Sequence, residues 1–110
     1  TLPNHPQHKL AETLLPHGCG AMLSFRVEDD RQKVNEFMHR LKVVKYLGTL
    51  GGYRTTIAHP ATAFRFDFTP QQLRDMGMAE GLIRISSGIE STEDLIADFK
   101  QALSVFDTVR

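Results

Sequence analysis

Two short segments alternate between two kinds of side chain, and this alternation constrains the fold more than any other feature. Residues 82–86 place Ile83 and Ile85 on one side and Arg84 on the other. In residues 21–27, one side carries Leu23, Phe25 and Val27, and the other carries Met22, Ser24 and Arg26. Successive side chains of a strand point to opposite faces, so each segment predicts a half-buried strand. Residues 43–47 and 55–59 are further β-prone runs, which gives about four strands.

Helical signals separate these strands. The expected helices are residues 6–15, 31–41, 69–77 and 91–106. Thr69 and Pro70 supply an N-cap and a favoured first helical residue, and Ser91 opens the last helix. Apolar residues at helical spacing give that helix one predicted apolar face, formed by Leu95, Ile96, Phe99, Leu103 and Phe106. Pro60 is interpreted only as the end of a strand.

The resulting order, α-β-α-β-β-α-β-α, predicts an α+β fold. We expect a small mixed sheet of about four strands with helices mainly on one face, because so few helices cannot cover both faces. No repeat or linker divides the chain, so residues 1–110 are interpreted as a single domain. The second face of the sheet is then available to a partner.

Composition excludes several classes of partner. Thirteen basic and thirteen acidic side chains cancel, so nucleic acid and anionic membranes are not expected to bind. No segment has the roughly 20 apolar residues of a membrane span. Cys19 is the only cysteine, which excludes an internal disulfide and fits the cytoplasm. The first residue is not Met, which fits either processing or a piece of a longer chain.

Arg84 is the most informative polar residue of the predicted sheet. A guanidinium on a partly covered face needs an anion, and its planar fork suits a carboxylate. The alternative is an ordinary exposed or salt-bridged arginine. Residues 48–52 contain three glycines between two expected strands, so they form either the wall of a pocket or a flexible turn.

Neither a metal centre nor a catalytic machine is predicted. The spacing of the five histidines completes no zinc set, and solvated histidines are the simpler interpretation. Cys19 and the serines have no partner histidine and acid that spacing singles out. We therefore expect no catalytic residue in this chain.

Several ordered motifs give the chain a resemblance to a known family. They are Thr49–Gly52, His59–Ala61, Gly81–Glu90 and Glu93–Asp98, together with the opening Leu2–His8 and the strand Gly20–Phe25. Their order and spacing resemble the C-terminal domain of the cystathionine γ-synthase-like enzymes, which depend on pyridoxal 5'-phosphate (PLP). The family commonly shows Ser-Leu-Gly-Gly, then His-Pro-Ala, then Ile-Arg-Leu-Ser-Val-Gly-Ile-Glu. The resemblance covers essentially the whole chain.

The resemblance implies the small C-terminal domain of a fold-type I PLP-dependent transferase, on the substrate side. It implies β- or γ-elimination, or γ-replacement, in cysteine and methionine metabolism, as in a cystathionine γ-synthase, a cystathionine lyase, a methionine γ-lyase or an O-acetyl- or O-succinylhomoserine sulfhydrylase. PLP would be held by a lysine of a large N-terminal domain that this chain lacks. Arg84 would bind the substrate carboxylate. Thr49 would lie near the cofactor lysine, and Leu50 would line the substrate pocket. A tetrameric full-length enzyme is also implied.

Three departures from the family pattern leave the individual activity open. Thr49 replaces the usual serine, Arg65 replaces a common histidine, and Gly48 lies where members differ. The alternative to a domain of such an enzyme is a free-standing α+β module for small-molecule binding or interaction, without catalysis. Such a module is expected to cover the sheet face that carries Arg84.

Overall fold

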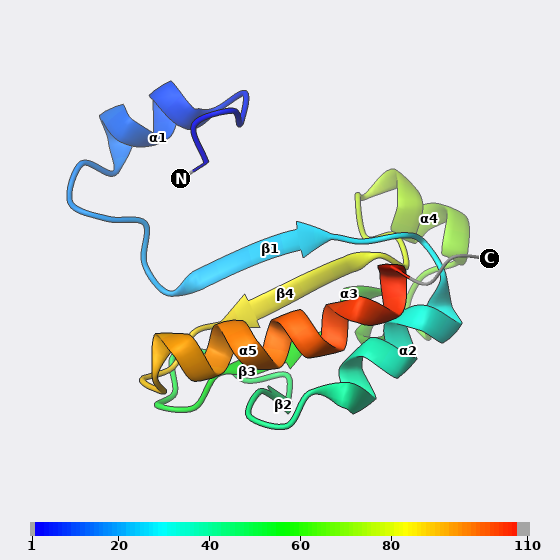
Figure 1. The fold of residues 1–110 in the computed structure, drawn as a ribbon. Coiled ribbons are helices and arrows are strands. Elements are labelled where there is room, and N and C mark those ends of the chain that lie inside the picture. The colour runs from blue at the N-terminus through cyan, green and yellow to red at the C-terminus, as the bar shows by residue number, and fades with distance from the viewer. Residues whose placement is uncertain (1, 108–110) are drawn as a thin grey trace.

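The computed structural model describes residues 2–107 (Figure 1). The strands are β1 (Met22–Arg26), β2 (Lys45–Tyr46), β3 (Thr56–Ala58) and β4 (Leu82–Ser86). The helices are α1 (His8–Leu14), α2 (Arg31–Arg40), α3 (Pro60–Ala63), α4 (Pro70–Asp75) and α5 (Thr92–Leu103), followed by a 3-10 turn, η1 (Ser104–Asp107). Within this part of the chain, no helix is both long and apolar enough to cross a membrane.

The strands form one mixed sheet in the order β1-β4-β3-β2. β4 pairs antiparallel with β1 and β3, whereas β2 pairs parallel with β3. Arg84 lies opposite Ser24 of β1 and Ala58 of β3. Residues directly opposite each other share a face, so these three side chains lie on the same side of the sheet.

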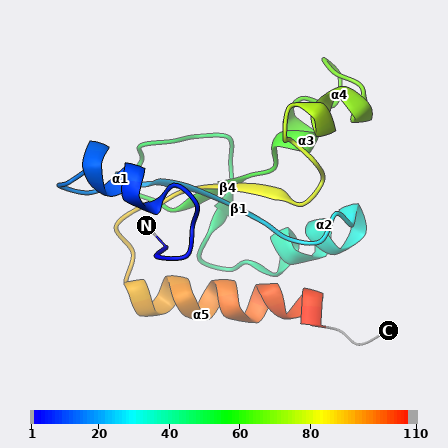
Figure 2. The ribbon, with the colours of Figure 1, turned by 90° about the horizontal axis from the view of Figure 1, so that it is seen from above.

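Helices α2 and α5 cover the other side of the sheet (Figures 1 and 2). The buried core lies beneath them and consists of Val34, Phe37, Val44, Ile57, Ile83, Ile85, Ala102 and Val105. α3 and α4 lie next to each other near one end of the sheet (Figure 1). The predicted mixed sheet with helices mainly on one face is therefore confirmed. We call the side that α2 and α5 leave uncovered the open face.

Local signals explain why the helices begin where they do. Thr69 and Gln72 form a complete capping box at the start of α4, as the sequence predicted. The side chain of Asp30 accepts hydrogen bonds from two backbone N–H groups at the start of α2, and Ser91 caps α5. Gly77 follows α4 with a φ of 80°, a value that glycine adopts readily.

Four expectations about the elements were wrong in detail. Pro60 does more than end β3, because it is the first residue of α3, which the sequence analysis missed. α1 begins at His8 rather than at Pro6 and buries no residue. β2 is confined to Lys45–Tyr46, since the backbone before it is bound by a side chain of α5. Ile96 was assigned to the apolar face of α5 but is 61% exposed.

Candidate functional site on the open face of the sheet

Arg84 lies in the middle of β4, on the open face. Its neighbours along the strand, Ile83 and Ile85, are 0% and 5% exposed and point into the core. Arg84 itself is half-buried. No carboxylate of residues 2–107 forms an ion pair with it. The salt-bridged alternative therefore does not describe this arginine, whose guanidinium remains available for an anion.

The connection between β2 and β3, which includes Thr49 and Leu50, passes over the side of the sheet away from α5 (Figure 2). The hydroxyl of Thr56 donates to the carbonyl oxygen of Thr49 at 3.1 Å, and the backbone N–H of Gly51 donates to Ser86 Oγ at 3.1 Å. Thr56 and Ser86 lie opposite each other in the sheet register. Ser86 is two residues from Arg84 and therefore lies on the same face.

This connection is held as a defined turn rather than as a loose one. Gly51 has a φ of 72°, which a side chain would disfavour, and its N–H is anchored as described. Thr49 is exposed, and Leu50 is 65% exposed. The backbone is thus fixed while both side chains remain free to contact another group. Arg84, Thr49 and Leu50, the residues singled out from the sequence, lie on one face.

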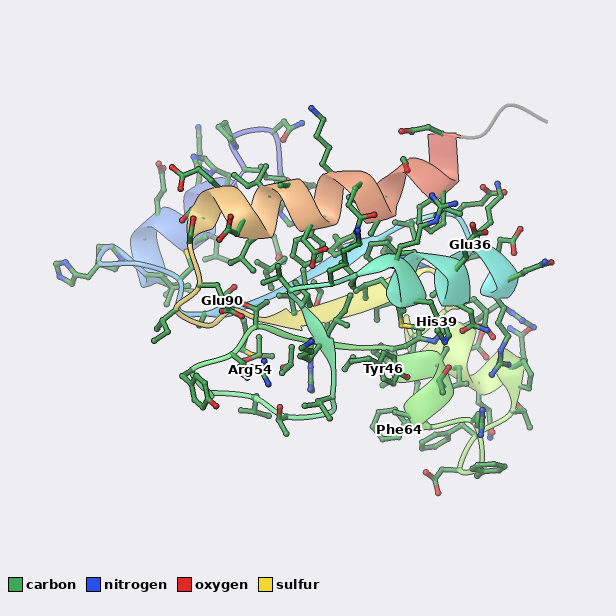
Figure 3. The ribbon with its side chains drawn as sticks, turned by 60° about the horizontal axis from the view of Figure 1, so that its bottom comes forward. Glu36, His39, Tyr46, Arg54, Phe64 and Glu90 are labelled. Atoms are coloured by element: carbon green, nitrogen blue, oxygen red, sulfur yellow. The ribbon has the colours of Figure 1, made fainter. Side chains whose placement is uncertain are left out.

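Glu90 fixes the far end of the same connection (Figure 3). Its carboxylate accepts hydrogen bonds from the backbone N–H and the hydroxyl of Thr55, at 2.8 Å and 2.9 Å. That hydroxyl in turn accepts from the N–H of Gly88 at 2.8 Å. The backbone hydrogen bond from Thr55 is the main reason why the pKa of Glu90 is lowered, and it outweighs the opposing effect of burial.

Asp98, on α5, fixes the segment that precedes β2. Its carboxylate accepts hydrogen bonds from the backbone N–H groups of Lys42, Val43 and Val44 at 2.8 to 2.9 Å. Burial raises the pKa of Asp98. These three hydrogen bonds and one from Gln101 together lower it by more than burial raises it, so the net pKa lies below the ordinary value. The chain segment that enters β2 is therefore tied to a helix rather than paired in the sheet.

The sequence analysis assigned no role to Glu90 or Asp98. Each belongs to a motif that carries the family resemblance, but their partners lie 35 and 54 to 56 residues away. Asp98 had one usable local signal, since it lies three residues after Leu95, on the buried side of the last helix.

His59 corrects the expectation of solvated histidines. It is 1% exposed, and Nε2 donates to the carbonyl oxygen of Glu80 at 2.6 Å. Because a carbonyl only accepts, Nδ1 is left as the acceptor for the hydroxyl of Thr62, 2.7 Å away. His59 thus joins α3 to the start of β4. Within residues 2–107, no three His, Cys, Asp or Glu side chains gather as a metal site.

The residues present do not form a PLP site on their own. Every lysine of the chain is exposed or half-buried. The amine of Lys33 is paired with Glu28. The amine of Lys45 contacts the carbonyl of Lys42. The open face offers a guanidinium and the 48–52 turn, which suit the carboxylate of a small molecule.

Comparisons with known proteins identify the family of the chain. The family model described as Cys/Met metabolism PLP-dependent enzyme matches residues 1–104. The chain is 33% identical over 94% of its length to O-acetyl-L-homoserine sulfhydrylase 1 of Thermus thermophilus, covering 24% of that protein. It is 37% identical over 93% of its length to L-methionine gamma-lyase of Treponema denticola, covering 25% of that protein.

A solved structure is similar to this chain in both fold and sequence. It is cystathionine gamma synthase from Xanthomonas oryzae pv. oryzae in complex with aminoacrylate and cysteine, with a TM-score of 0.82 and 38% identity. The match covers 96% of this chain and 27% of that one. The chain therefore spans about a quarter of the length of the relatives it matches.

Proposed function

The chain belongs to the Cys/Met metabolism PLP-dependent enzyme family, and on that premise we propose that it is the C-terminal, substrate-side domain of such an enzyme. The proposed reaction is β- or γ-elimination, or γ-replacement, on an amino acid of cysteine and methionine metabolism. A sulfhydrylase, a lyase and a synthase are all similar to this chain at 33 to 38% identity. These similarities support the reaction class and leave the choice within it open.

One observation carries the proposal: Arg84 is half-buried on the open face without an ion pair among residues 2–107. A guanidinium in this position suits the α-carboxylate of an amino acid, which it binds through two parallel hydrogen bonds. A charge-assisted contact of this kind is worth about 1.5 to 3 kcal/mol. A free-standing module is expected to cover this face. The uncovered face therefore supports the proposal that the chain is a domain of a larger protein.

Thr49 and Leu50 have a second role in the proposal. The turn that carries them is anchored at Thr56 and Ser86, next to Arg84 on the sheet. We assign Leu50 to the wall of the substrate pocket and Thr49 to the neighbourhood of the cofactor. PLP, held by the rest of the protein, supplies electron withdrawal from the substrate. Arg84 fixes the carboxylate and thereby the orientation of the bonds at Cα, and such positioning lowers the barrier.

The partner of the open face is, in this proposal, the large N-terminal domain that makes up most of the relatives' length. This chain covers only 24 to 27% of the matched proteins. We further propose a cytoplasmic enzyme, in keeping with a single exposed cysteine, and assembly of the whole protein as a tetramer.

The test is Arg84→Ala in the full-length protein that carries this chain. Loss of the carboxylate contact is expected to raise KM and to lower kcat/KM by at least about tenfold. Arg26→Ala is the matched control, because Arg26 is an exposed arginine on the same face of the neighbouring strand. Unchanged kinetics for Arg84→Ala would remove this residue from the site.

A further inference from the structure

A second concave site lies between α3, α4 and the turn that precedes α2. Its volume is about 170 Å³. Its lining consists of Asp29, Arg31, Ala61, Arg65, Phe68, Pro70, Leu73, Arg74, Met78, Ala79 and Glu80. Arg84, Thr49 and Leu50 are not among these residues. Charges of both signs therefore surround an apolar floor, away from the residues assigned to the proposed function.

The basic side of the cavity has unused charge. Arg74 donates one hydrogen bond to the side-chain oxygen of Gln71 at 2.8 Å, and the guanidinium of Arg65 lies 4.7 Å from the centre of the Phe66 ring. Neither arginine forms an ion pair with a carboxylate of residues 2–107. Arg65 and Arg74 both line the cavity, and two guanidinium groups favour an anion such as a carboxylate.

The carboxylate of Glu80, on the lining of the same cavity, makes only long contacts with cationic or donor groups. Oε1 of Glu80 is 3.6 Å from Arg31, which is a long ion pair. Oε2 is buried and has no hydrogen-bond partner among residues 2–107; Nε2 of His59 lies 3.7 Å away and already donates to the Glu80 carbonyl oxygen. A buried carboxylate oxygen without a donor is costly. A cationic group that enters the cavity would relieve this cost.

The floor of the cavity is apolar and its size limits the ligand. Ala61, Leu73 and Ala79 are 4 to 6% exposed and form a packed surface. A cavity of about 150 Å³ is large enough for benzene, so about 170 Å³ accommodates a small aliphatic group and excludes a nucleotide. A ligand with both charges must therefore carry them close together.

We propose that this cavity binds a free α-amino acid with a small aliphatic side chain. The carboxylate lies between Arg65 and Arg74, the ammonium group donates to Glu80, and the side chain rests on Leu73 and its apolar neighbours. This arrangement uses the two guanidinium groups and the weakly paired carboxylate of Glu80 at once. The proposal does not rest on the function assigned to Arg84, because the two sets of residues do not overlap.

The test is calorimetric titration of the full-length protein that carries this chain, with Arg84→Ala introduced to remove binding at the open face. L-leucine is the probe. The comparison ligands are 4-methylpentanoate, which lacks the ammonium group, and isoamylamine, which lacks the carboxylate. We expect saturable binding of L-leucine, and binding of both comparison ligands that is at least about tenfold weaker.

Variants then assign the contacts. In the same Arg84→Ala protein, Arg65→Ala and Arg74→Ala are each expected to weaken L-leucine binding by at least about fivefold. Arg40→Ala is the control, because Arg40 is paired with Glu36 on α2 and does not line the cavity. Glu80→Gln is expected to weaken L-leucine while leaving 4-methylpentanoate unchanged.

Three results would overturn the proposal. The first is the absence of saturable heat with L-leucine in a protein that unfolds as cooperatively as the parent. The second is equal affinity for 4-methylpentanoate, which would make the cavity an anion site only. The third is unchanged L-leucine binding in the variants of Arg65 and Arg74. Both residues are exposed, so their substitution is expected to leave the fold intact.

Discussion

Strand β4 presents different side chains to its two faces, and their surroundings differ accordingly. Ile83 and Ile85 pack beneath α2 and α5 and are almost completely buried. Arg84, between them, lies half-buried on the face that α2 and α5 leave uncovered and has no ion pair within residues 2–107. In the proposed function, one alternating strand thus separates packing from substrate binding. Stability and activity are therefore expected to respond to different substitutions.

The largest loss of stability is expected on the helix-covered face. Phe37 is fully buried, with the rings of Phe25 and Phe106 at centroid distances of 6.3 and 6.0 Å. Phe37→Ala removes this ring and leaves a cavity, at a cost of about 3 to 5 kcal/mol. Denaturant unfolding of the 110-residue chain measures it. A loss below about 1 kcal/mol would show that the core lies elsewhere.

A smaller loss of stability is expected from a substitution at the contact between α5 and the segment before β2. Asp98→Ala leaves the backbone N–H groups of Lys42, Val43 and Val44 without their acceptor, at a cost of about 2 to 4 kcal/mol. Asp94→Ala, on the exposed first turn of the same helix, is the control, with an expected change of about 0.3 to 1 kcal/mol. Equal effects of the two substitutions would contradict the anchoring role of Asp98.

The same carboxylate gives a pH dependence. The pKa of Asp98 is lower in the folded chain than in the unfolded chain. Its contribution to stability is therefore complete above the ordinary carboxyl pKa of about 4 and is lost as the pH falls through the lowered value. The pKa of Glu90 is lowered as well, so the contribution of Glu90 to stability is also lost as the pH falls. The free energy of unfolding is measured between neutral and acidic pH. It is expected to fall less steeply with decreasing pH for Asp98→Asn than for the parent chain.

The open face is expected to tolerate change with little loss of stability. Ser86→Ala removes the acceptor for the N–H of Gly51, at a cost of about 1 kcal/mol. The main consequence is a looser turn around Thr49, visible as faster amide exchange at Gly51. Protection of Gly51 equal to that of the parent would mean that Ser86 does not anchor this turn.

Local patterns in the sequence predicted the parts of the fold that depend on neighbours along the chain. The alternation around Arg84 correctly placed its side chain on the other face of the strand from Ile83 and Ile85. The capping box of α4 also formed as expected. Periodicity alone misplaced Ile96, since it marks an apolar stripe without showing how far the neighbouring elements extend.

The remaining features depend on contacts between distant segments. His59 binds the carbonyl of Glu80, 21 residues away, and Asp98 binds backbone groups at least 54 residues away. No periodicity or turn signal encodes such pairs, because they exist only once the sheet has assembled. The position of Thr49 beside the open face likewise depends on Thr56 and Ser86, which different strands contribute.

The most direct test of this separation compares two adjacent residues of β4, Ile83→Val and Arg84→Ala, in the full-length protein. Ile83→Val is expected to cost about 0.5 to 1.5 kcal/mol of stability and to leave kcat/KM within about twofold of the parent. Arg84→Ala is expected to change stability by less than about 0.5 kcal/mol and to lower kcat/KM by at least about tenfold. If both substitutions reduced kcat/KM in proportion to stability, the separation of packing and binding on this strand would be contradicted.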